Sequence, residues 1–246
     1  MRPAPHTVPR DAMTGEDGFM EVEKTKKRAD SLVNLAYEQI KEDLARGYFK
    51  PGEKIVFREL VERYAISETP IKQALNRLVT EGLVESIPRR GMRICERSPS
   101  DFKETLDIRY ILEDYFAPVV METMSFHTDI LERMKRNVQR QYELIQQMDQ
   151  VETFMEYYRL DHEFHSTYIK CSGNHRAMQV YEGIGAHSFG NFLYHKKPKE
   201  KFLSGTREHE MIVEALEAQD LDALRKAIRI HVDNGKASID YMRLGF

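Results

Sequence analysis

Apolar side chains recur at helical spacing along most of this chain, and the segments they mark divide it in two. In residues 31–46 an apolar residue stands at every fourth position, and Gly47 follows, which predicts an amphipathic helix that ends there. Residues 1–23 show no such period and contain three prolines, so we expect a disordered leader.

Two closely spaced helices are expected next, over residues 57–64 and 67–82. We expect Ser67 to cap the second helix and Gly82 to end it in the left-handed conformation. An apolar stripe on this helix consists of Ile71, Ala74, Leu75 and Leu78. The opposite face is polar and carries Glu68, Thr69, Lys72, Gln73 and Asn76. The pair predicts a helix-turn-helix whose second helix reads DNA.

Two short β-prone runs follow, over residues 83–87 and 92–95. Between them stands Pro-Arg-Arg-Gly, so the tip of the hairpin that we expect carries Arg89 and Arg90. A hairpin with a basic tip after a recognition helix is typical of a wing. Residues 24–97 therefore predict a winged helix-turn-helix domain.

The charge distribution supports this assignment. Residues 24–97 hold 16 Lys and Arg against 11 Asp and Glu, a balance of +5. Residues 98–246 hold 19 against 24, a balance of −5, and residues 1–23 hold 2 against 5. Phosphate attraction needs a local cationic surface, so a sequence pI near 6.3 is compatible with DNA binding.

Everything after residue 100 has the apolar period of helices. The linker is expected over residues 97–100, with Ser100 or Asp101 as the cap of the next helix. Breaks at residues 171–174 and 196–205 separate later helices. Six helices over residues 98–246 predict an antiparallel bundle, a fold that commonly holds ligands between facing helices.

The composition limits the class of protein. No apolar run approaches membrane-spanning length, so we expect no membrane partner. Cys95 and Cys171 stand far apart, and the N-terminus lacks a continuous apolar segment. We therefore predict a cytoplasmic protein without a disulfide.

Four residues of the bundle suggest a metal site. Asp161 and His165 stand four apart and share one helix face, which alone is weak support. His209 and His231 add weight because each lies near the inward stripe of a later helix. Three imidazoles and one carboxylate from three helices suit Zn²⁺, Ni²⁺, Co²⁺ or Mn²⁺.

Arg109 stands four residues before Glu113 on the first helix of the bundle. The simplest explanation is a surface ion pair, which contributes only a few tenths of a kcal/mol, roughly 0.2–0.5. The functional alternative is an anion clamp, because an arginine fork near a metal binds a carboxylate with two hydrogen bonds.

These motifs resemble those of the GntR transcription regulators, in the FadR-like branch whose effector domain is the all-helical FCD domain. The DNA-binding matches are residues 49–55, 67–75, 78–83 and 88–91. The effector matches are residues 109–113, 161–165, 172–174 and 208–209, with His231.

The resemblance implies a homodimeric repressor that binds a palindromic operator. A small organic or sugar acid bound in the bundle is expected to release it from the DNA. It maps the family's metal ligands onto Asp161, His165, His209 and His231, and its carboxylate-binding arginine onto Arg109. Arg58 resembles a DNA contact from the second helix. The bundle resembles the VanR-type size, which makes an acyl-CoA effector less favoured.

Two positions depart from the family pattern, because Glu68 and Lys72 replace arginines of the recognition helix. A glutamate repels phosphate but accepts a hydrogen bond from cytosine N4. Gln73 and Asn76 are suited to adenine, and Thr69 and Lys72 to phosphates. We therefore expect an operator that differs from the usual one.

Two alternatives remain at this point. A metal site with open positions also activates water in hydrolase-like enzymes, although no motif pairs this one with a general base. The metal could instead be the effector itself, in which case DNA affinity would follow the metal without any organic ligand.

Overall fold

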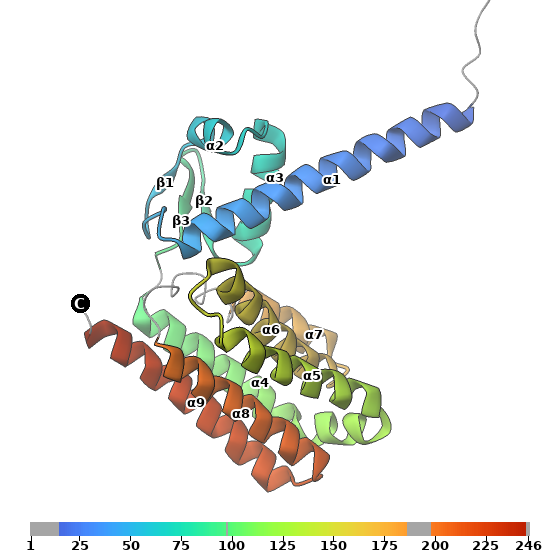
Figure 1. Ribbon diagram of the computed structural model, residues 1–246, viewed down its shortest axis with the longest axis vertical. Helices are drawn as coiled ribbons and strands as arrows, with labels where there is room; N and C mark the ends of the chain where they lie inside the picture. Colours follow the sequence, from blue (N-terminus) through green and yellow to red (C-terminus); the bar gives the residue numbers. More distant parts are fainter. Residues whose placement is uncertain (1–14, 97, 186–197, 245–246) are drawn as a thin grey trace, which may run out of the picture.

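The computed structural model describes residues 15–96, 98–185 and 198–244, and side chains within residues 30–239 (Figure 1). It confirms the predicted class, a winged helix-turn-helix followed by an all-helical bundle. No helix in the described part of the chain is long and apolar enough to cross a membrane.

The first helix is longer than the apolar period predicts. Helix α1 spans Gly15–Ala45, so the disordered leader expected over residues 1–23 is wrong for residues 15–23. Residues 1–14 lie outside the described residues. The extension follows from local helix propensity, because residues 19–30 contain Glu, Lys, Met and Ala and neither Gly nor Pro.

Helices α2, Phe57–Tyr64, and α3, Glu68–Thr80, form the helix-turn-helix. Ala65 adopts a left-handed conformation in the turn between them. Gly82 has a φ of 69°, and Leu83 N–H donates to the Leu78 carbonyl at 2.9 Å, which closes α3 as predicted. The prediction that Ser67 caps the helix through its side chain was wrong, since its side chain makes no cap hydrogen bond.

The wing forms as predicted, with one additional strand. Strands β2, Val84–Ile87, and β3, Gly91–Ile94, pair antiparallel and bring Ile87 opposite Gly91. Strand β1, Lys54–Ile55, pairs with the free edge of β3, so the sheet order is β1-β3-β2. The short β1 was not predicted, because a run of two residues is too short to show the alternation of apolar and polar side chains that marks a strand.

The winged domain has its own core beneath α3. The apolar stripe predicted for this helix is buried together with one face of α1 and the inner faces of the sheet. Its fully buried members include Ile40, Leu44, Ile71, Leu75, Leu78 and Leu83. This core holds α3 so that its polar face stays in solvent.

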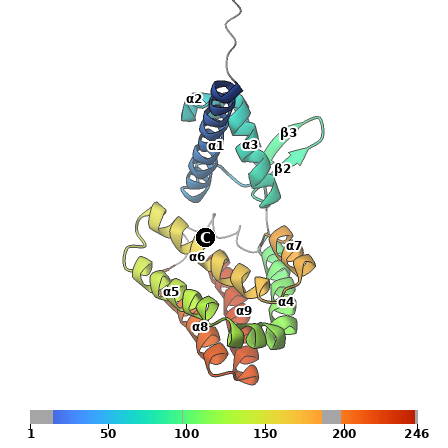
Figure 2. The same ribbon diagram turned by 90° about the vertical axis from the view of Figure 1, so that its right-hand side faces the viewer.

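Six described helices form the effector domain (Figure 2). They are α4, Pro99–Phe126; α5, Thr128–Ile145; α6, Val151–Lys170; α7, His175–Gly183; α8, Lys199–Glu217; and α9, Leu221–Leu244.

Two predicted boundaries in this domain need correction. Ser98, and not Ser100 or Asp101, caps α4, in a capping box in which Ser98 and Asp101 exchange hydrogen bonds. Helix α8 begins at Lys199 directly after Pro198, so residues 199–205 are helical where a break was expected. Proline is compatible with a helix start because its missing N–H has no partner to lose there.

The two domains meet at the end of α1 and the start of α6. Ala45 packs into an apolar cluster with Ile145, Val151 and Phe154 of the effector domain. Arg46 forms an ion pair with Glu152 at 3.3 Å. Helix α6, which carries two of the predicted metal ligands, therefore also faces the DNA-binding domain (Figure 2).

Candidate metal centre and DNA-binding surface

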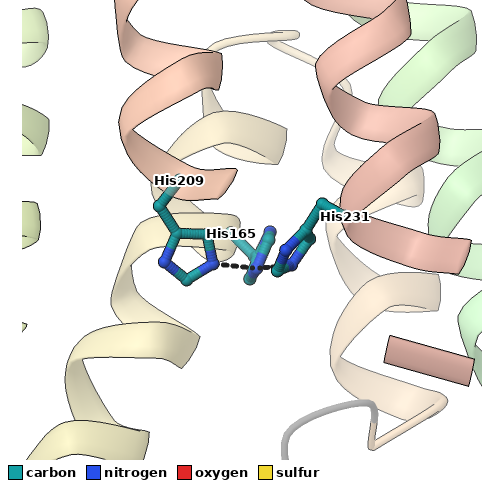
Figure 3. Close-up of side chains that lie close together, drawn as sticks. All are labelled: His165, His209 and His231. Atoms are coloured by element: carbon teal, nitrogen blue, oxygen red, sulfur yellow. Dashed lines mark hydrogen bonds between the residues drawn. The ribbon is translucent and has the colours of Figure 1, made fainter. Parts of the chain in front are cut away.

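Three histidines from three helices converge in the effector domain (Figure 3). His165 lies on α6, His209 on α8 and His231 on α9, and their exposed fractions are 1%, 0% and 7%. His165 Nε2 lies 3.1 Å from His209 Nε2 and 3.2 Å from His231 Nε2. The structure thus brings together three of the four predicted ligands.

The other nitrogen of each ring meets an acceptor oxygen. The Nδ1 atoms of His165, His209 and His231 lie 2.9 Å from oxygens of Glu113, Gln141 and Glu208, respectively. An ionised carboxylate only accepts, so Nδ1 of His165 and of His231 carries the proton. Such outer contacts orient metal-binding imidazoles.

The amide of Gln141 is oriented by a chain of hydrogen bonds. Asn137 donates from Nδ2 to the Leu160 carbonyl at 3.1 Å, so its Oδ1 is free to accept from Gln141 Nε2 at 2.7 Å. Gln141 Oε1 must then face His209. His209 therefore also carries its proton on Nδ1.

With all three protons on Nδ1, three Nε2 lone pairs point toward one another. Lone pairs at 3.1 and 3.2 Å repel unless a cation or an added proton lies among them. An added proton is disfavoured at His231, because burial lowers the pKa of this ring. Ligands at about 2.0–2.1 Å from one ion lie roughly 3.0–3.4 Å apart, so the spacing suits a divalent metal.

Asp161, the fourth predicted ligand, borders the three rings. It stands one turn before His165 on α6, and its Oδ1 lies 3.6 Å from His209 Nε2. Its side chain is 21% exposed, whereas the rings are buried. Asp161 is thus placed at the open side of the cluster, and its role as a ligand stays a prediction.

Arg109 and Glu113 are buried, so the surface ion pair considered from the sequence is wrong. Arg109 Nε lies 3.4 Å from Glu113 Oε1, and the side chains are only 7% and 2% exposed. Burial alone would raise the pKa of Glu113, but the charge of Arg109 and the contact with His165 lower it to about 2. The carboxylate stays ionised and keeps holding His165.

Glu208 plays the same part for His231. Burial opposes its ionisation, but hydrogen bonds from His231, Asn234 and Ser204 keep its pKa below the usual value. Neither Glu208 nor Gln141 was predicted from the sequence to hold a histidine. For Gln141 the detectable sign was a polar residue in the inward stripe of α5, between Val138 and Ile145.

The three other histidines in the described part of the chain stand apart from the three rings. His127 and His175 are exposed. His162 stacks on Tyr181, and burial lowers the pKa of its ring. His6, His187 and His195 lie outside the described residues.

All predicted DNA contacts lie on the surface of the winged domain. Arg58 lies on α2, Arg89 and Arg90 lie between β2 and β3, and Ser67, Glu68, Thr69, Lys72, Gln73 and Asn76 lie at or along α3. Each is exposed. Lys72 Nζ lies 2.5 Å from Glu68 Oε1, and Arg58 pairs with Glu62 at 2.9 Å. Glu68 and Lys72, which stand where the family pattern has arginines, thus form one solvent-exposed ion pair.

A winged helix-turn-helix joined to a helical bundle with a buried polar cluster defines a DNA-binding transcriptional regulator with an effector domain. Comparison with known families agrees with this class. The family of bacterial regulatory proteins called gntR matches residues 32–94, and the FCD domain matches residues 104–234. The chain belongs to the GntR family and carries an FCD effector domain.

Relatives are regulators as well. An uncharacterised HTH-type transcriptional regulator of Agrobacterium vitis is 27% identical over 148 residues, 57% of this chain and 80% of that protein. The HTH-type transcriptional repressor RspR of Escherichia coli is 24% identical over 212 residues, 84% of this chain and 88% of RspR. These families are transcriptional regulators and not enzymes, which removes the hydrolase-like alternative.

Solved structures share the fold. Escherichia coli McbR/YncC superposes with a TM-score of 0.67 at 18% identity, over 86% of this chain and 98% of that one. At this identity the similarity concerns the arrangement of the elements alone.

Proposed function

We propose that this protein is a homodimeric repressor that binds a palindromic operator and senses a small organic or sugar acid at a metal ion in the effector domain. The observation that carries the proposal is the convergence of three buried Nε2 atoms whose rings are all oriented by oxygens on Nδ1. This arrangement would be unfavourable in a purely structural polar core, because the three Nε2 lone pairs face one another and repel.

His165, His209 and His231 would hold the metal, and Asp161 would add a carboxylate from its open side. A divalent ion such as Zn²⁺, Ni²⁺ or Mn²⁺ supplies positive charge and open positions for an oxygen of the acid. Arg109 supports the proposal as the second cation, since it is buried on α4 next to the carboxylate that holds His165. A guanidinium there offers the acid a fork of donors.

The DNA-binding half of the proposal rests on the exposed polar face of α3 and the basic wing. A two-fold operator matches a symmetric dimer, with one winged helix on each half-site. RspR is named a repressor, which favours repression over activation here. Glu68 would accept from cytosine, Gln73 and Asn76 would read adenine, and Arg58, Arg90 and Lys72 would bind phosphates.

A second candidate effector is the metal itself. The three rings form a site without any contribution from an organic ligand, which favours this variant of the same function. The two variants differ in a measurable way, because only acid sensing requires Arg109.

The test begins with the metal content of the full chain purified without added metal or chelator. Melting temperatures are then measured with a panel of small carboxylates for the wild type and for His165→Ala, His209→Ala and Arg109→Ala. His175→Ala is the matched control, since this imidazole is exposed and lies apart from the cluster.

We expect bound metal in the wild type and in His175→Ala, and its loss in His165→Ala and His209→Ala. One acid should raise the melting temperature of the wild type and not that of Arg109→Ala. If metal alone stabilises and no acid does, the metal is the effector. A wild type that binds neither metal nor acid would refute the proposed sensing site.

A further inference from the structure

A cavity of about 330 Å³ opens where α4 ends, α5 begins and α6 ends. It lies at the end of the bundle away from the winged domain (Figure 1). Glu152 at the start of α6 meets Arg46, whereas Lys170 follows 18 residues later, roughly 27 Å along the helix. We call this space the α6-end cavity. Its polar lining includes Thr123, His127, Arg133, Thr167, Lys170 and Cys171.

The charge of the α6-end cavity is opposite to that of its domain. Residues 98–246 carry 24 Asp and Glu against 19 Lys and Arg. The lining nevertheless holds Arg133, Lys170 and His127 and no acid. Asp129 lies near Cys171, but it does not line the cavity. A cavity whose charges have one sign attracts a ligand of the opposite sign.

The cavity also gathers hydrogen-bond donors that lack acceptors. Arg133 Nη2 donates to Thr167 Oγ1 at 3.1 Å, which uses one of the five guanidinium donors. Thr167 is only 4% exposed, and its own O–H meets no acceptor among the described residues. Lys170 forms no ion pair within the described part of the chain. An anion with several oxygens would satisfy these donors together.

The start of α5 adds positive potential at the same place. This helix has 18 residues and begins at Thr128, and its N-cap, His127, makes no side-chain cap hydrogen bond. The first amides of a helix have no partner within it, and the helix dipole places partial positive charge there. The helix start thus reinforces the attraction that Arg133 and Lys170 exert on an anion.

The α6-end cavity is separate from the candidate metal centre. Thr167 follows His165 by two residues on α6, so the two side chains leave the helix about 200° apart. Neither the three converging histidines nor Arg109 line the cavity. A ligand in this cavity therefore would not compete for the residues of the proposed acid and metal site.

We propose that the α6-end cavity binds the phosphate group of a small anion. Arg133 would engage two phosphate oxygens with its guanidinium, Lys170 would add a point charge, and Thr167 would donate from the floor. A phosphate monoester carries about −1.5 to −2 charge and three strong acceptor oxygens, which match these donors better than the two oxygens of a carboxylate. The inference does not depend on the proposed function.

The size of the cavity limits the ligand. Cavities that bind small molecules measure about 300–1,000 Å³, so this one suits inorganic phosphate or a phosphate ester with a small organic part. DNA is a poorer occupant, because its predicted contacts lie on the winged domain at the other end of the molecule. The acidic effector domain would also repel the many phosphates of a duplex.

The test is isothermal titration calorimetry on the full chain with two probes, inorganic phosphate and glycerol 3-phosphate. Binding of either supports the site, and the tighter of the two identifies the source of the phosphate group. Both titrations are repeated with a chelator that empties the metal centre. Binding that disappears with the chelator would belong to the metal centre and would overturn the proposal, as would a wild type that binds neither probe.

Substitutions in the lining show whether the bound anion occupies this cavity. We expect the dissociation constant to rise at least about 10-fold in Arg133→Gln and about 3–10-fold in Lys170→Gln. Arg136→Gln is the matched control, because Arg136 is exposed on α5 and does not line the cavity. It should bind like the wild type. Equal affinities in the wild type and all three variants would overturn the proposal.

A second measurement needs no variant. Acetic anhydride acetylates accessible lysines, and mass spectrometry gives the rate at each position. We expect inorganic phosphate to slow the acetylation of Lys170 and not that of Lys226, an exposed lysine on α9. An unchanged rate at Lys170 under conditions where calorimetry detects binding would place the anion elsewhere and overturn the proposal.

Discussion

Two ion pairs with the same helical spacing behave differently in the two domains. On α3, Glu68 and Lys72 stand four residues apart and are 54% and 53% exposed. On α4, Arg109 and Glu113 also stand four residues apart, but they are 7% and 2% exposed. The sequence presents both as ordinary i, i+4 pairs, and only the second is part of a buried network.

The difference shows how environment changes what a pair of charges does. The exposed pair is screened by water and exchanges easily for contacts with DNA, so it suits recognition. The buried pair has lost its water, so each charge depends on the other and on His165. It suits a site that must keep an imidazole in one orientation.

The strongest way to test this contrast is to remove one carboxylate from each pair. Glu113→Ala leaves Arg109 buried without its partner, and we expect a loss of about 3–5 kcal/mol in the free energy of unfolding. Glu68→Ala removes a solvated pair and should cost less than about 1 kcal/mol. Urea denaturation measures both values. Equal and small losses would mean that Arg109 finds water or another partner after the change.

The next effect concerns the oxygen that orients His209. Gln141→Leu removes it, so His209 loses its fixed tautomer, and we expect the dissociation constant for Zn²⁺ to rise about 10–100-fold. Gln139→Leu is the control, because Gln139 lies half a turn away on the same helix and is exposed. Competition with a chromophoric chelator gives both constants. If Gln141→Leu binds like the control, the network around Gln141 has no influence on the metal.

A third test asks whether the exposed pair on α3 reads bases. Glu68→Gln loses a carboxylate that accepts from cytosine N4, and a contact of this kind contributes about 1–3 kcal/mol of discrimination between bases. Selection of binding sequences from random DNA should show a changed preference at one position in each half-site. Glu38→Gln, a similar change of charge on α1, should leave the selected sequence unaltered. An unchanged preference in Glu68→Gln would limit Glu68 to pairing with Lys72.

The smallest effect is expected in the wing. Arg90→Ala removes one predicted phosphate contact, so the slope of log affinity against log salt should decrease by about 1, without a change in sequence preference. Arg46→Ala is the comparison, because Arg46 is engaged with Glu42 and Glu152 on the side of the effector domain. Equal slopes in the wild type and Arg90→Ala would exclude the wing tip from DNA contact.

Local rules were sufficient for much of this fold. The apolar period marked the helix-turn-helix and all six described helices of the bundle, because one face of each must be buried. Turn chemistry marked the hairpin and the left-handed Gly82. Where local rules misled, the cause was also local: the helix-forming residues 19–30 extended α1 towards the N-terminus, and α8 began directly after Pro198 where a loop was expected.

The helical period was enough to find the three histidines of the candidate site, since His165, His209 and His231 each fall on or beside an inward stripe. Helix packing brings their Nε2 atoms together, sets oxygens of Glu113, Gln141 and Glu208 against the opposite nitrogens, and leaves Asp161 at the edge. None of this could be read from the period, because it reports which face of a helix is buried and not how the faces of different helices are set against one another.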